Sequence, residues 1–150
     1  MRNKIKILLL LFLTQCGYTT VYDNKSFDDF NISIISMEGD KKINNLIKSK
    51  LKKYSNRNLN KEFKITIITN YKKKIITKDI TGKAEDFELK LFTEFQIDFN
   101  GKSQKFSFNE KLKIKNSSNS FELRNYENVI KDNFVESIKD KLILKLKSVK

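Results

Sequence analysis

Apolar and polar side chains alternate most regularly between residues 87 and 99. The odd-numbered positions there carry Phe, Leu, Ile or Thr, and most even-numbered positions carry Glu, Lys, Gln or Asp. A period of two predicts a β-strand with one buried and one solvated face. Asn100-Gly101 follows, a pair typical of tight hairpin turns, and the alternation resumes from Lys105 to Lys115. The sequence therefore predicts a long antiparallel hairpin.

Two further stretches alternate over shorter spans. One runs from Phe30 to Ile34, and the other begins at Phe63 and extends toward Tyr71. Both patterns predict strands. We expect the lysines at 72–74 to interrupt the second strand, and residues 77–84 to form a loop around Gly82.

Helical periodicity occurs in two places. Asp40 can cap a helix whose apolar face comprises Ile43, Leu46, Ile47, Leu51 and Tyr54, with Lys41, Lys48, Lys52 and Lys53 on its other side. A second helix is predicted to close the chain, and Asn119 with Glu122 could form its capping box. Its apolar positions are Ile130, Phe134, Val135, Ile138, Leu142, Leu146 and Val149.

The predicted order of elements is β-α-β-β-β-α. Four strands with one apolar face each, and two helices with one apolar stripe each, predict an α+β fold. We expect a two-layer sandwich in which both helices pack on one face of a four-stranded sheet. Residues 30–150 are predicted to form this single domain.

The N-terminus has the pattern of an export signal. Three basic residues precede an apolar run from Ile7 to Leu13, which is too short to span a bilayer, since a spanning helix needs about 20 residues. A buried N-terminal helix or strand is the alternative, but basic residues before the run and polar residues after it argue against burial. Residues 1–15 are therefore predicted to be a signal peptide, and residues 16–29 a tether.

Composition excludes several kinds of site. The chain of 150 residues has no His and one Cys, Cys16, so His/Cys zinc sites, internal disulfides and catalytic triads that use imidazole are excluded. No metal or cofactor is expected. The net charge is +13, mostly from Lys, and an AT-rich coding sequence could account for part of it.

Residues around Cys16 resemble known lipoprotein sequences. Leu13 stands three residues before Cys16, as in the lipobox of bacterial lipoproteins, although Gln15 is unusual there. This resemblance implies lipidation of Cys16; an ordinary signal followed by a free thiol is the alternative. The segment from Cys16 through Val21-Tyr22, the strand pattern over 84–91 and the element order are together similar to the lipopolysaccharide-assembly lipoprotein family, LptE.

The resemblance implies a function without catalysis. Members of that family sit inside the outer-membrane β-barrel LptD, help it assemble and help to insert lipopolysaccharide into the outer leaflet. The chain would then be an outer-membrane lipoprotein, held by its lipid anchor and facing the periplasm. The alternative is a periplasm-facing scaffold or pilot for another envelope machine.

Two groups of lysines are candidate contacts for lipopolysaccharide, whose phosphates lysine can bind as a point charge. The first is Lys72, Lys73, Lys74 and Lys78, and the second is Lys105, Lys111, Lys113 and Lys115. Both could instead be solvated charges that discourage edge pairing of strands.

Two other classes of function are disfavoured. Most Phe side chains are expected in the core, which leaves few to stack on bases, so no nucleic-acid partner is expected. An enzyme would have to use carboxylate pairs such as Glu85-Asp86 or Glu94 with Asp98, which any charged surface also provides.

Overall fold

The computed structural model describes residues 30–55 and 59–149. The elements are β1 (Asn31–Gly39), α2 (Lys41–Leu51) with a 3-10 turn η2 (Lys52–Tyr54), β2 (Glu62–Lys78), β3 (Ala84–Phe99), β4 (Lys102–Lys115) and α3 (Ser120–Ser148). The predicted order β-α-β-β-β-α is confirmed. The predicted signal peptide, the tether and Cys16 lie outside the described residues.

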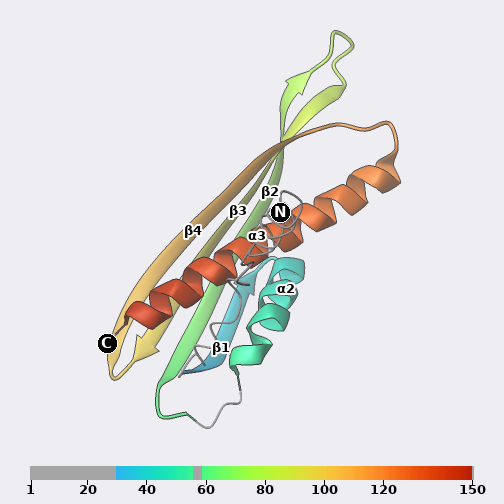
Figure 1. Ribbon diagram of the computed structural model, residues 1–150. Helices are drawn as coiled ribbons and strands as arrows, with labels where there is room; N and C mark the ends of the chain where they lie inside the picture. Colours follow the sequence, from blue (N-terminus) through green and yellow to red (C-terminus); the bar gives the residue numbers. More distant parts are fainter. Residues whose placement is uncertain (1–29, 56–58, 150) are drawn as a thin grey trace, which may run out of the picture.

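The four strands form one mixed sheet in the order β1-β2-β3-β4. β1 runs parallel to β2, with α2 as the crossover between them, and the remaining pairs are antiparallel hairpins. Helices α2 and α3 pack side by side on one face of the sheet (Figure 1). The predicted two-layer α+β sandwich is therefore confirmed.

The core lies between the sheet and the two helices. Alternation along β3 places Leu89, Leu91, Phe95 and Ile97 on the helix side, where each is at most 2% exposed. The fully buried side chains of the helices lie on the apolar faces that the helical period predicted, and they include Ile43, Leu51, Ile138 and Leu142. The faces of the predicted strands and helices are thus confirmed.

The predicted caps and hairpin turn are present. The carboxylate of Asp40 accepts a hydrogen bond from the Ile43 amide at 2.9 Å, and Asn119 Oδ1 accepts from Phe121 and Glu122 amides. The other half of the expected capping box differs, because the Asn119 amide donates to Ser117 Oγ rather than to Glu122. Asn100 and Gly101 both have positive φ, 49° and 73°, as a tight hairpin turn requires.

The expected break at residues 72–74 is wrong. β2 continues to Lys78 and pairs with β3 from Lys64 onward except at Ile76, so that the turn shrinks to residues 79–83. Lys72 and Lys74 fit the strand because their side chains face solvent, and Lys73 fits because α3 supplies a carboxylate, Glu127. Two register shifts, between Ile75 and Thr77 and between Thr77 and Lys78, precede the turn. The β2–β3 hairpin therefore extends beyond the rest of the sheet (Figure 1).

Candidate functional site: a lysine-rich open face of the sheet

One face of the sheet is open, because both helices lie on the other. Even-numbered positions of β2 up to Lys74 and of β3 point to this open face, and so do odd-numbered positions of β4. Within the described residues no element covers it. Side chains there are available to a partner.

Lysines from three neighbouring strands lie together on the open face, near the end of the sheet that carries the β2–β3 turn. Lys72 of β2 is directly opposite Lys90 of β3, which is directly opposite Lys111 of β4. We call these three residues the lysine row. Neighbouring strands lie about 4.8 Å apart, so the row extends over about 10 Å.

The next positions toward the β2–β3 turn add more charge. Lys74, Glu88 and Lys113 form the adjacent row, and Asp86 pairs with Lys115 beyond it. We call the lysine row and these five residues together the open-face patch. The patch has six lysines and two carboxylates, and it therefore has an excess of four positive charges.

The two carboxylates neutralise only part of the patch. Glu88 pairs with Lys90 at 2.8 Å, and Asp86 pairs with Lys113 at 3.0 Å. A hydrogen bond from Lys90 lowers the pKa of Glu88, and hydrogen bonds from the Thr77 hydroxyl and then Lys113 lower the pKa of Asp86. Both acids are therefore ionised at neutral pH.

Lys72 and Lys111 have no ion-pair partner in the described part of the chain. Like charges directly opposite on neighbouring strands destabilise a sheet. An anion over the lysine row would remove this repulsion, so the open-face patch is suited to a phosphate-bearing partner.

The first group of predicted site lysines divides between the two faces. Lys72 and Lys74 belong to the open-face patch, whereas Lys73 points to the helix side. Its ammonium pairs with Glu127 of α3 at 2.9 Å and lies 4.4 Å from the centre of the Phe87 ring. Lys78 is exposed at the last pair of the hairpin, opposite Ala84.

The second predicted group contributes three lysines to the same patch. Lys111, Lys113 and Lys115 lie beside the first group, whereas Lys105 lies farther along β4 and pairs with Glu94 at 3.1 Å. The structure thus joins the two groups that the sequence presented separately. Lys90, at the centre of the lysine row, was missed.

A cluster of charged and polar side chains around Glu127 lies on the helix side of the sheet, behind the open-face patch. Its carboxylate accepts a hydrogen bond from Tyr71 at 2.8 Å and pairs with Lys73 and Lys131, each at 2.9 Å. Burial by itself would raise the pKa of Glu127, but bonds from Lys131, Lys73 and Tyr71 outweigh it and hold the pKa at about 2. Burial and the same carboxylate raise the pKa of Tyr71 well above its usual range. The cluster fastens α3 to β2 on the side opposite Lys72 and Lys74.

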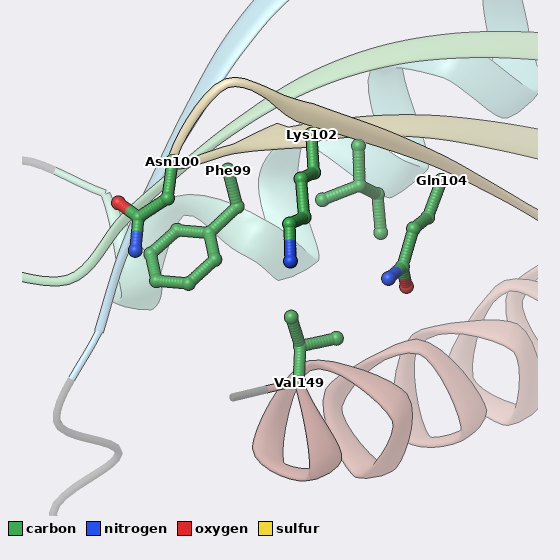
Figure 2. Close-up of a pocket in the computed structure, with 6 residues that line it drawn as sticks. Phe99, Asn100, Lys102, Gln104 and Val149 are labelled. Carbon is green, nitrogen blue, oxygen red and sulfur yellow. The ribbon is translucent and has the colours of Figure 1, made fainter.

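A small pocket lies at the other end of the sheet, between the β3–β4 turn and the end of α3. Figure 2 shows Phe99, Asn100, Lys102 and Gln104 around it, with Val149 approaching from α3. Its volume is about 90 Å³, below the roughly 300–1,000 Å³ of sites for small ligands. The pocket is therefore a weaker candidate than the open face.

Two further features of the described residues bear on function. No three acidic, His or Cys side chains come together there as a metal site would require. No helix in residues 30–55 or 59–149 has the length and apolar character needed to cross a membrane.

Several solved structures with a similar fold are bacterial lipoproteins. Rare lipoprotein B from Shewanella oneidensis matches 77% of this chain and 91% of its own, with a TM-score of 0.57 and 19% identity. The chain has the rare lipoprotein B fold. A minor lipoprotein from Acinetobacter baumannii (TM-score 0.54, 13% identity) matches 77% of this chain and 93% of its own. Lipoprotein B from Nitrosomonas europaea (TM-score 0.52, 12% identity) matches 77% and 83%.

The rare lipoprotein B fold is LptE-like, so the resemblance expected from the sequence is confirmed at the level of the fold. No protein-family model matches the sequence, and a search of curated proteins gives no significant match. The likeness to these lipoproteins therefore lies in the arrangement of strands and helices, at 12–19% identity.

Proposed function

We propose that the protein is an outer-membrane lipoprotein that partners the lipopolysaccharide-translocating barrel LptD. In this proposal Cys16 carries the lipid anchor, the folded domain faces the periplasm and plugs the barrel, and the open-face patch binds lipopolysaccharide. The protein would assist assembly of the barrel and insertion of lipopolysaccharide into the outer leaflet, without catalysing a reaction. The observation that carries the proposal is the lysine row on the bare face of a rare lipoprotein B fold.

The chemistry of lipopolysaccharide fits the patch. Its lipid A part carries phosphates, and its core sugars carry further negative charge. An anionic oxygen above Lys90 would lie within one strand spacing of both Lys72 and Lys111. Charge-assisted hydrogen bonds to phosphate are among the stronger ones in proteins.

The physics of a plug is also consistent with this fold. A large outer-membrane barrel has a polar lumen that a separate domain can fill. A sheet whose outer face is polar can line such a lumen, while the helices keep the apolar core away from it. A protein anchored by several acyl chains stays at the membrane almost permanently.

A binding titration tests the lipopolysaccharide site. We expect the double change Lys72→Glu with Lys111→Glu to weaken lipopolysaccharide binding by about 10–30-fold, because two charged contacts at about 1 kcal/mol each are lost. Binding of the unchanged protein should also weaken with added salt, since screening shortens the reach of charges from about 10 Å at 0.1 M to about 3 Å at 1 M.

A matched variant controls for bulk charge. Lys48→Glu with Lys145→Glu makes the same change in net charge on exposed positions of the helix layer. This control should bind lipopolysaccharide within about twofold of the unchanged protein. Equal weakening by both double variants would show that binding follows net charge alone, and the open-face patch would then lose its assignment.

A further inference from the structure

The two edges of the sheet differ in their protection against pairing with another chain. Edge strands present unpaired N–H and C=O groups, and lysines on such a strand discourage further pairing. At one edge, β4 carries five lysines in its 14 residues. At the other edge, β1 has no lysine in 9 residues, and Glu38 is its single charged side chain. The β1 edge is therefore the unprotected one.

The backbone of β1 has hydrogen-bonding groups to offer at this edge. Asn31 N–H donates to the Lys61 carbonyl at 2.8 Å and so points toward β2. Along a strand, the backbone N–H and C=O groups of successive residues point alternately to the two sides. The N–H and C=O of Ile32 and Ile34 therefore point to the free edge. A bulge between Ile34 and Ser36 shifts the register, and it confines the regular edge to the first four residues of the strand.

A groove lies between this edge and α2, which are neighbours at the border of the fold (Figure 1). Ile32 and Ile34 line it from β1, and Asn45, Lys48 and Lys52 line it from α2. Its volume is about 670 Å³. A second depression of about 440 Å³ continues it along the strand and shares Ile34, Asn45 and Lys48. The groove is therefore long enough for several residues of an extended chain.

The groove carries more positive than negative charge, because Lys48 and Lys52 line it beside a single carboxylate, Glu62. Lys48 and Lys52 are exposed, and neither has an ion-pair partner in residues 30–55 and 59–149. Lys50, which points away toward α3, instead pairs with Asp132 and Glu136 at 3.0 Å. The cations that face the groove are thus the ones left for a partner to neutralise.

We propose that the groove between β1 and α2 binds an extended acidic segment of a partner protein by strand addition. Main-chain bonds to Ile32 and Ile34 would hold the segment, and Lys48 and Lys52 would select its acidic side chains. A second copy of this chain is a poorer occupant, because it would bring another lysine-rich surface to the same lysines and only Glu38 from its own edge. This proposal does not depend on lipopolysaccharide binding.

A defined peptide tests the proposal on the full chain in mild detergent. The probe is a fluorescein-labelled octapeptide of alternating valine and glutamate, titrated by anisotropy, with amide hydrogen exchange followed at saturation. We expect saturable binding and at least about tenfold slower exchange at the Ile32 and Ile34 amides, because edge amides gain hydrogen-bond partners. Lys48→Glu should weaken binding by about tenfold. Lys145→Glu, the matched charge change on α3, should leave it within about twofold.

Several results would overturn the proposal. One is equal binding of a peptide whose backbone amides are all N-methylated, because N-methylation removes the backbone donors whichever way the segment runs. Others are binding without protection of the Ile32 and Ile34 amides, or protection of these amides before any peptide is added, by dimerisation or by the chain itself. Lys72→Glu with Lys111→Glu should bind the peptide normally, which separates this site from the open-face patch.

Discussion

Glu127 connects the two layers of the fold through a single carboxylate. It holds Tyr71 and Lys73 of β2 and Lys131 of α3, and it is ionised down to a pH of about 2. Its pKa is lower in the folded protein than the ordinary 4.5. The stability that it contributes is therefore complete above about pH 4.5 and is lost as the pH falls toward 2.

Glu127→Gln should lower the free energy of unfolding at pH 7 by about 2–3 kcal/mol, as expected for a mostly buried carboxylate whose pKa falls from 4.5 to about 2 on folding. Urea unfolding at pH 7 and at pH 2.5 measures this. The difference between the variant and the unchanged protein should shrink at the lower pH. Glu122→Gln, on an exposed position of the same helix, should cost no more than about 0.5 kcal/mol at either pH. A difference for Glu127→Gln that does not depend on pH would contradict the ionised cluster.

Among the elements, β3 contributes side chains to both faces of the sheet. Its inward side chains form the centre of the core, and its outward Lys90 is the middle of the lysine row. A substitution on β3 should therefore affect stability or binding according to the face on which it lies.

Phe95→Ala should lower the free energy of unfolding by about 3–5 kcal/mol, because Phe95 is fully buried and contacts the Phe108 ring from β4. The adjacent Glu94→Gln removes only an exposed ion pair with Lys105 and should cost about 1 kcal/mol or less. Denaturant titrations of the two variants compare the faces directly. Similar losses would mean that the strand's faces are reversed.

The sequence predicted β3 and β4 as a hairpin, and their register can be counted from it, because a two-residue turn leaves no freedom. Asn100-Gly101 between the strands places Lys90 opposite Lys111 and Glu88 opposite Lys113 by counting alone. Lys90 could thus have been found from the sequence, at an outward position of the alternation. The core face of α2 and that of α3 from Ile130 onward were also predictable, because the apolar positions there recur with a helical period.

The position of β2 against β3 could not be predicted in the same way. The turn at residues 79–83 is longer, and two register shifts precede it, so that the pairing of Lys72 with Lys90 cannot be counted from a turn. The alternation from Phe63 onward does place Lys73 on the inner side if the strand continues. Three consecutive lysines argued against that continuation, because one of them would have to face the core. Glu127, which stabilises Lys73 there, is 54 residues away in sequence and could not be recognised as its partner.

At the scale of the whole molecule, the start of β1 and the open-face patch lie at opposite ends of the sheet. β1 begins beside Glu62, whereas Lys72 lies ten residues farther along β2, which is about 33 Å in a strand. An anchor attached before β1 would therefore hold the end of the domain that is distant from the patch. Anchoring and lipopolysaccharide binding should be separable.

Cys16→Ser tests this separation. We expect the variant to leave the membrane fraction or to keep its signal peptide, because the thiol that would carry the lipid is absent. Its affinity for lipopolysaccharide in detergent should remain within about twofold of the unchanged protein, since the patch is untouched. Fractionation with labelled fatty acid measures the first effect. A Cys16→Ser protein that still carries label and sediments with membranes would contradict lipidation at this residue.

Co-purification from membranes solubilised in mild detergent tests the proposed partnership most directly. The full chain, tagged at its C-terminus, should bring down a large outer-membrane β-barrel of the lipopolysaccharide-exporting kind in a constant ratio. The open-face variant Lys72→Glu with Lys111→Glu should retain that barrel if the patch serves the lipid rather than the partner. Recovery of a secretion ring in place of the barrel, or of no large partner at all, would contradict the proposed function.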